Sequence, residues 1–173
     1  PPASHEAYPT VNSTINPPPV TGVTLTMDKV SPQPQGSVIT FTGVATGGSG
    51  TYQYYFTIKD PVTKTWSIAQ AYSGNSTWQW NTTGINFGTH IVQVWAKNVE
   101  STASYEAYQS VNYTINPPPV TGVTLTMDKV SPQPQGSVIT FTGVATGGSG
   151  TYQYYFTIKD PVTKAWSIAQ AYS

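Results

Sequence analysis

The sequence predicts an all-β protein built as a sandwich of two sheets, and three observations support this prediction. Aromatic residues make up 13% of the chain and charged residues only 8%, while Gly and Pro number 15 each among 173 residues. β-Branched and aromatic side chains favour the pleated, half-buried surface of a strand, and Gly and Pro favour turns. Short runs of alternating apolar and polar residues also recur between clusters of turn-forming residues, as they do in sandwiches.

The second half of the chain repeats the first with a period of 100 residues. Residues 117–173 match residues 17–73 except that Thr65 becomes Ala165, and residues 3–15 match residues 103–115 with four differences. We therefore expect three parts. Residues 1–15 form the last strand of a preceding repeat, residues 16–115 form one complete repeat, and residues 116–173 form the first part of the next.

No counterpart of residues 74–100 follows Ser173, so we interpret the sequence as a window from a longer array. An alternative is donor-strand assembly, in which the N-terminal strand of one chain enters the unfinished domain of another. The N-terminal segment would supply only the last strand of that domain. Complete restoration of the domain by this route is therefore not expected.

Seven strands are expected within the complete repeat. They span residues 23–27, 37–45, 51–59, 64–71, 76–81, 89–98 and 105–115. Turn-forming sequences such as 47–50 (GGSG) and 60–61 (DP) separate them. Seven strands in about 100 residues predict an immunoglobulin-like or fibronectin type III-like Greek-key sandwich, in which the first, second and fifth strands face the other four.

Period-two alternation assigns one side of these strands to the core. The expected core residues are Ile39, Phe41, Ala45, Tyr52, Tyr54, Phe56, Ile58, Trp78, Trp80, Val92, Val94 and Ala96. Burying one large apolar side chain contributes about 1.5–3 kcal/mol. A set of this size can therefore hold the domain together without disulfides, and the chain has no cysteine.

Four strings carry a family resemblance: residues 23–29 (VTLTMDK), 37–42 (SVITFT), 47–54 (GGSGTYQY) and 88–98 (GTHIVQVWAKN). They resemble the immunoglobulin-like and fibronectin type III-like tandem repeats of bacterial cell-surface and secreted proteins. The resemblance covers the whole repeat and consists of strand and turn patterns. It implies an extracellular or cell-surface array and carries over no catalytic residue.

Charge and motif content exclude several classes of function. Seven basic and seven acidic residues give no net charge, so no nucleic-acid partner is expected. No apolar run reaches the roughly 18 residues of a membrane span, so no membrane insertion is expected in this segment. No carboxylate pair has the spacing of an acid and a base, and Asp28 and Asp60 are expected to stabilise turns. His90 is interpreted as an interior histidine, and no enzyme activity, metal or cofactor is expected.

The sharpest candidate site is a row of aromatic residues on the outside of one sheet. Tyr55, Trp95 and Tyr108 have the parity opposite to the core on three neighbouring strands. Such a row could stack sugar rings or contact neighbouring copies of the chain. Another interpretation is that Lys59 and Lys97 cover the rings.

Two further features bear on an extracellular role. Residues 17–19 are three prolines, which favour an extended path and would stiffen the junction between domains. Asn-X-Ser/Thr sequences place N-glycosylation candidates at Asn12, Asn75, Asn81 and Asn112.

The function expected from these features is that of a structural repeat in an extracellular or cell-surface fibrous protein, such as a stalk, fibre or filament. Its partners would be neighbouring copies of itself. Two alternatives remain: a carbohydrate-binding or adhesive module that uses the aromatic face, and a spacer attached to an enzyme outside this sequence.

Overall fold

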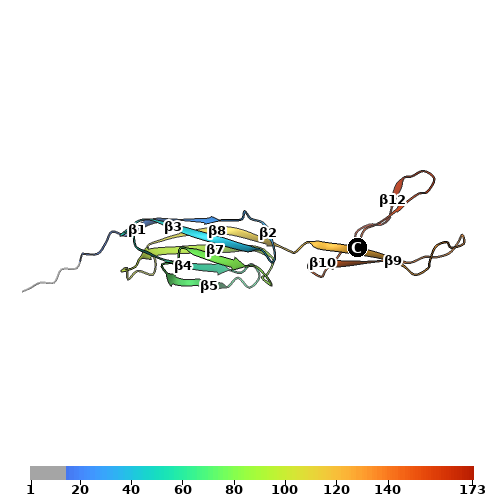
Figure 1. Ribbon diagram of the computed structural model, residues 1–173. Helices are drawn as coiled ribbons and strands as arrows, with labels where there is room; N and C mark the ends of the chain where they lie inside the picture. Colours follow the sequence, from blue (N-terminus) through green and yellow to red (C-terminus); the bar gives the residue numbers. More distant parts are fainter. Residues whose placement is uncertain (1–14) are drawn as a thin grey trace, which may run out of the picture.

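The computed structural model describes residues 15–173, and every regular element among them is a strand (Figure 1), so the all-β prediction is confirmed. One antiparallel sheet has the order β1-β3-β6 and contains β1 (Val20–Met27), β3 (Val38–Gly47) and β6 (Thr77–Asn81). The second sheet has the order β2-β8-β7-β4-β5. Its strands are β2 (Gln33–Pro34), β4 (Tyr52–Lys59), β5 (Trp66–Ser73), β7 (Gly88–Asn98) and β8 (Ala107–Asn116).

Each of the seven expected strands is present, with ends within three residues of those expected. Strand β2 was not expected, because residues 31–36 (SPQPQG) are rich in turn-forming residues and were interpreted as a turn. Its two residues pair in parallel with Ile115 and Asn116 at the end of β8. Two residues are too few to show an alternating pattern, so this short strand has no signal in the sequence.

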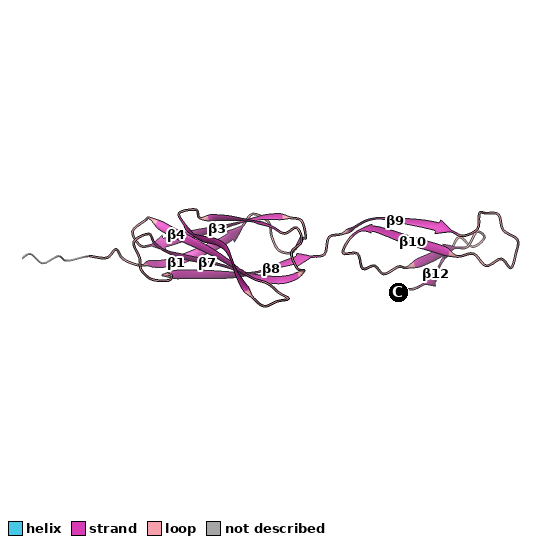
Figure 2. Cartoon of the chain, turned by 90° about the horizontal axis from the view of Figure 1, so that it is seen from below, coloured by secondary structure: helices cyan, strands magenta, loops and turns pink. Residues whose placement is uncertain are grey.

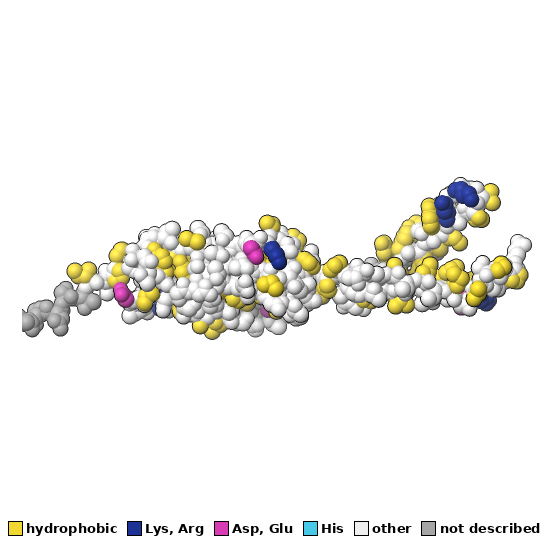
Figure 3. All heavy atoms as spheres, viewed as in Figure 1, with side chains coloured by type: hydrophobic (Ala, Val, Ile, Leu, Met, Phe, Trp, Pro, Cys, Tyr) yellow, Lys and Arg dark blue, Asp and Glu magenta, His cyan; other side chains and the backbone are white. Residues whose placement is uncertain are grey.

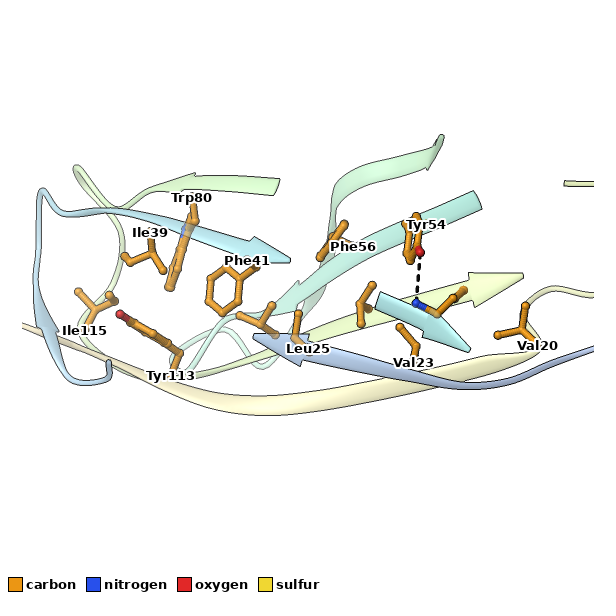
Figure 4. Close-up of a cluster of buried hydrophobic side chains, with 14 residues drawn as sticks. Val20, Val23, Leu25, Ile39, Phe41, Tyr54, Phe56, Trp80, Tyr113 and Ile115 are labelled. Carbon is orange, nitrogen blue, oxygen red and sulfur yellow. Dashed lines mark hydrogen bonds between the residues drawn. The ribbon is translucent and has the colours of Figure 1, made fainter. Parts of the chain in front are cut away.

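The core lies between the two sheets (Figure 4). Phe41 of β3 stacks on Trp78 with ring centroids 5.6 Å apart and meets the edge of Tyr113 from β8 at 5.5 Å. All twelve expected core residues are buried or pack against the buried cluster. The cluster also contains residues that the parity argument did not assign to the core: Val20, Val23, Leu25, Tyr113 and Ile115.

The two sheets approach each other closely beside Gly43. A Cβ atom on Gly43 would lie 3.0 Å from Cγ2 of Val94 and 3.2 Å from Cδ1 of Tyr54. The neighbouring Ala45 amide donates a hydrogen bond to the Tyr54 hydroxyl at 3.2 Å, drawn as a dashed line in Figure 4. Gly43 therefore makes room for the ring that satisfies this buried amide.

Residues 117–173 form two separate hairpins. β9 (Val120–Met127) pairs with β10 (Phe141–Gly147), and β11 (Phe156–Lys159) pairs with β12 (Trp166–Gln170). The register repeats the first unit, with Val123 opposite Ala145 as Val23 is opposite Ala45.

The copied core residues have very different exposure in these hairpins. Leu125 is 60% exposed against 8% for Leu25, and Phe141 is 46% exposed against 0% for Phe41. Figure 3 shows hydrophobic side chains along the surface of the hairpins. The same residues are buried only where β6, β7 and β8 pack on them, so the core depends on residues 77–116.

The chain enters and leaves the complete unit at opposite ends (Figures 1 and 2). At the entry, Val20 of β1 pairs with Gly47. At the exit, Ile115 of β8 pairs with Gly88 and Gln33. Both connecting segments therefore lie in line with the long axis of the sandwich.

Candidate functional site

Five aromatic rings form a continuous row across the outer face of the five-stranded sheet. We call this set, Tyr72, Tyr55, Trp95, Tyr105 and Tyr108, the outer aromatic row. Neighbouring ring centroids in that order lie 5.2, 5.3, 5.0 and 5.5 Å apart. The pairing of the strands places Tyr55 opposite Trp95 and Trp95 opposite Tyr108. The structure therefore brings together the three aromatic residues that parity selected.

Parity did not select Tyr72 and Tyr105. Tyr72 lies near the end of β5, beyond a register shift in its pairing with β4, and Tyr105 precedes the first residue of β8. Regular alternation does not extend to either position. Their tyrosine identity in a Thr- and Ser-rich surface is the only signal that could have found them.

A row of hydroxyl and amide side chains runs beside the aromatic row. Thr57, Gln93 and Ser110 occupy the next outward positions on β4, β7 and β8. The Trp95 indole Nε1 donates to Gln93 Oε1 at 2.6 Å, and Gln93 Nε2 donates to Ser110 Oγ at 2.9 Å. These bonds fix the orientation of the indole. A shallow groove of about 350 Å³ on this face is lined by Tyr55 and Trp95 of the aromatic row, by Thr57 and Gln93 of the polar row, and by Trp66 of β5.

The lysines cover only part of this face. Lys97 Nζ lies 4.6 Å from the ring centroid of Tyr72 and donates to the carbonyl oxygens of Ser101 and Ala103. Lys59 Nζ lies 6.0 Å from the ring of Trp66. Within residues 15–173, neither Lys59 nor Lys97 places its ammonium group over the ring of Tyr55, Trp95 or Tyr108, the three rings of the covering interpretation.

The phenol of Tyr72 lies at the more buried end of the row. Desolvation, with a smaller contribution from Tyr55, raises the pKa of Tyr72 to about 12. Its hydroxyl donates to the carbonyl oxygen of Ser104. Tyr72 is therefore held as a neutral hydrogen-bond donor.

A second group of side chains anchors the segment that enters the domain. Asn98, 1% exposed at the end of β7, donates from Nδ2 to the carbonyl oxygen of Pro18 at 2.9 Å. Its Oδ1 accepts from the amide and the hydroxyl of Ser49 at 2.8 and 3.0 Å. The amide of Gly48 donates to the carbonyl oxygen of Pro19 at 3.1 Å. We call these contacts, with those of Glu106, the entry anchor.

Glu106 completes the entry anchor with a carboxylate. Its Oε2 accepts from the amides of Val20 at 2.9 Å and Asn98 at 3.0 Å. Desolvation opposes ionisation, but the hydrogen bonds from Val20, Ser101 and Asn98 outweigh it and lower the pKa of Glu106 below its ordinary value. The residue is therefore an ionised acceptor at neutral pH. Sequence reasoning did not identify Asn98 or Glu106, because their partners lie far away along the chain.

The departing segment is held as well. Beside the β2–β8 pairing, the amide of Gln35 donates to the carbonyl oxygen of Asn116 at 2.9 Å. The amide of Thr114 donates to Ser31 Oγ at 2.8 Å. The turn that precedes β3 thus fixes the last residues of β8 before the second group of prolines.

Asp28, Asp60 and His90 each make contacts that stabilise the fold. The amide of Thr40 donates to Asp28 Oδ1, and the amides of Val62 and Thr63 donate to Asp60 Oδ1, all at 2.8 Å. His90 is 2% exposed, lies 2.9 Å from the carbonyl oxygen of Asn86 through Nε2 and packs edge-on against Trp80. In residues 15–173, no three His, Cys, Asp or Glu side chains gather as a metal site.

Three glycosylation candidates lie on the surface of the described chain. Asn75, Asn81 and Asn112 are exposed. The carboxamides of Asn75 and Asn81 accept the amides of Thr77 and Thr83, respectively, and so cap turns. Asn12 lies outside the described residues.

A scan of the sequence against protein-family models found no match, and a search of curated proteins found none. Across residues 15–173 there is no helix with the length and apolar character needed to cross a bilayer.

Proposed function

We propose that this chain is part of a tandem array of immunoglobulin-like Greek-key domains that forms a structural element of an extracellular or cell-surface fibrous protein. The observation that carries the proposal is the anchoring of the chain at both ends of one sandwich. The entry anchor binds Pro18, Pro19 and Val20, and the exit is held by β2 and Gln35. A domain that holds both of its linker segments by hydrogen bonds can restrict the angle between itself and the next repeat.

The sequence repeat supports the same proposal. Asn116 is followed by three prolines and Val120, as Asn16 is followed by three prolines and Val20. The amide of Gly148 donates to Pro119 at 2.9 Å, which reproduces the contact between Gly48 and Pro19. Consecutive prolines favour an extended polyproline II path, so a short anchored junction of this kind restricts bending.

Electron microscopy of the natural protein tests the array. Strands of eight to eleven residues at about 3.3 Å per residue, together with the loops at their ends, predict an axial repeat of roughly 30–45 Å. Fibres or stalks with this spacing are expected. Compact particles without an axial repeat would contradict the structural role.

The proposed cell-surface or extracellular location can be tested separately. Brief protease treatment of intact cells, followed by mass spectrometry of the released peptides, should yield peptides from residues 16–116. Their appearance only after lysis would contradict a cell-surface position. Culture supernatant analysed in parallel detects a secreted form.

A further inference from the structure

The outer aromatic row has a composition and shape that a purely structural repeat does not require. We propose that it is a binding site for a neutral polysaccharide chain lying across the strands of the five-stranded sheet. This proposal is separate from the array proposed above, since a site of this kind can serve one domain or many.

The first argument is the direction and spacing of the rings. Adjacent strands in a sheet lie about 4.7–4.9 Å apart, and the register places Tyr55, Trp95 and Tyr108 at one level on β4, β7 and β8. The ring of Tyr72 on β5 lies beside that of Tyr55. The four gaps between ring centroids are 5.0–5.5 Å, so a linear ligand across the sheet meets another ring at nearly every strand. A repeated sugar unit has an apolar C–H face that can pack on an aromatic ring. Successive rings from Tyr72 to Tyr105 are tilted by 30–45°, whereas Tyr108 stands edge-on to Tyr105 at 84°.

The second argument is the polar row beside the rings. A sugar that stacks one face on an aromatic ring presents hydroxyl groups at its edge. Gln93 and Ser110 supply neutral hydrogen-bonding groups along that edge, whereas Thr57 is 6% exposed and donates its hydroxyl to the carbonyl oxygen of Ser67 at 2.9 Å. Gln93 Oε1 retains a second lone pair beyond its bond to Trp95, and the Ser110 hydroxyl hydrogen remains available for donation. The site thus combines apolar faces with a few oriented polar groups, as small-molecule sites do.

The third argument is the narrowness of the aromatic surface. Gln53 and Lys97 border the row on one side. Ser110, Gln93 and Thr57 border it on the other side, where Ile68 continues the border on β5. A protein partner needs about 800 Å² of contact on each side, with an apolar centre. A row one ring wide, bordered by polar side chains on β4, β7 and β8, better fits a linear ligand. No carboxylate lies in these three rows, and the ammonium of Lys97 is already bound to two carbonyl oxygens.

Part of the row forms without the rest of the domain. In the second unit, Tyr155 and Tyr172 have centroids 5.1 Å apart, close to the 5.2 Å of Tyr55 and Tyr72. The hairpin formed by β4 and β5, or by their copies in the second unit, is therefore sufficient to bring these two tyrosine rings together. Trp95 and Tyr108 lie on β7 and β8, so only the complete unit contains the whole row. Trp95 is at its centre and is the residue to test first.

Isothermal titration calorimetry on the full chain provides the test, with hexamers of glucose, xylose, mannose and N-acetylglucosamine, and with a galacturonic acid hexamer as the charged comparison. At least one neutral hexamer should bind. Trp95→Ala should weaken binding by about tenfold, the upper range for one aromatic contact. Tyr108→Ala should weaken it by about threefold with little risk to folding, because Tyr108 is 55% exposed.

Trp166→Ala is the matched control. Trp166 is an exposed tryptophan on β12, outside the outer aromatic row, and its removal should leave the affinity unchanged. Gln93→Ala should weaken binding while retaining all five rings. The proposal is overturned if no neutral hexamer binds, if only the galacturonic acid hexamer binds, or if Trp95→Ala and Tyr108→Ala bind like the unaltered chain.

Sedimentation velocity on the same samples tests the competing occupant, a second copy of the chain. If no sugar binds, and the unaltered chain self-associates while Trp95→Ala does not, the row is a contact between copies.

Discussion

The buried carboxamide of Asn98 donates a hydrogen bond to the carbonyl oxygen of Pro18, although 80 positions separate the two residues. The same side chain accepts two hydrogen bonds from Ser49. One residue at the end of β7 therefore joins the entering segment to the loop after β3. The stability of this junction is open to direct measurement.

Replacing Asn98 with Ala should destabilise the complete domain by about 1–3 kcal/mol, because it removes the three hydrogen bonds that the buried Asn98 carboxamide makes to Ser49 and Pro18. Urea unfolding followed by tryptophan fluorescence measures the loss. Asn112→Ala is the control, since Asn112 is exposed on β8 and should cost little. Equal unfolding midpoints for the two variants would show that the side-chain hydrogen bonds of Asn98 contribute nothing to stability.

The loop 47–50 offers a matched pair of glycines. Gly48 and Gly50 have φ values of +69° and +86°, so alanine is strained at both. A Cβ on Gly48 would lie 2.5 Å from Asn98 Oδ1, whereas a Cβ on Gly50 would meet nothing within 4 Å.

Gly48→Ala should therefore cost about 1–3 kcal/mol more than Gly50→Ala, as expected when an atom is forced into a packed site. The difference in their free energies of unfolding isolates the contact with Asn98 from the backbone strain that the two share. The steric account fails if the variants are equally stable, or if Gly50→Ala is the less stable.

Substitutions of Tyr113 test the contribution of a core residue that the alternation of apolar and polar residues did not predict. It is 0% exposed, packs against Phe41 and Trp80, and donates its hydroxyl to the carbonyl oxygen of Lys29 at 2.8 Å. Tyr113→Phe should cost about 1 kcal/mol through this hydrogen bond. Tyr113→Ser should cost about 3–5 kcal/mol, as removal of a buried ring does.

Ser13 stands at the position equivalent to Tyr113 in the N-terminal copy. Thermal unfolding of the Tyr113→Phe and Tyr113→Ser variants measures the ring and the hydroxyl separately. Similar losses for both would assign the effect to the hydrogen bond, contrary to the packing account.

Strand positions and the facing of core residues could be predicted because each depends on local alternation. Tyr55, Trp95 and Tyr108 were found in this way, since regular pairing carries parity from β4 to β8. Tyr72 was not, because the pairing of β5 with β4 is irregular.

The entry anchor could not be found from local patterns. Glu106 accepts from Val20 across 86 positions, and a lone Glu before a strand resembles any solvated acid. The contact forms because the start of β8 and the start of β1 lie at the same end of the sandwich. Only the three prolines marked the junction in the sequence.

Asp60 provides a prediction about pH. Hydrogen bonds from the Thr63 amide, the Asn86 carboxamide and the Val62 amide lower the pKa of Asp60 from 3.8 to about 2. Because the folded pKa is lower than the unfolded one, the ionised group favours the fold above about pH 4. That contribution should decline as the pH falls from about 4 through about 2, where the folded carboxylate takes up its proton.

Carbon NMR of the side-chain carboxyl group against pH measures the pKa directly. Asn86→Ala should raise the pKa of Asp60 toward 3.8, because it removes the hydrogen bond to Oδ2 at 2.9 Å. Asp160 is the internal control: it accepts the amides of Val162 and Thr163 in the same turn sequence, and its pKa is also lowered. Its titration should not respond to Asn86→Ala. An unchanged Asp60 curve in that variant would show that the backbone amides alone hold the carboxylate ionised.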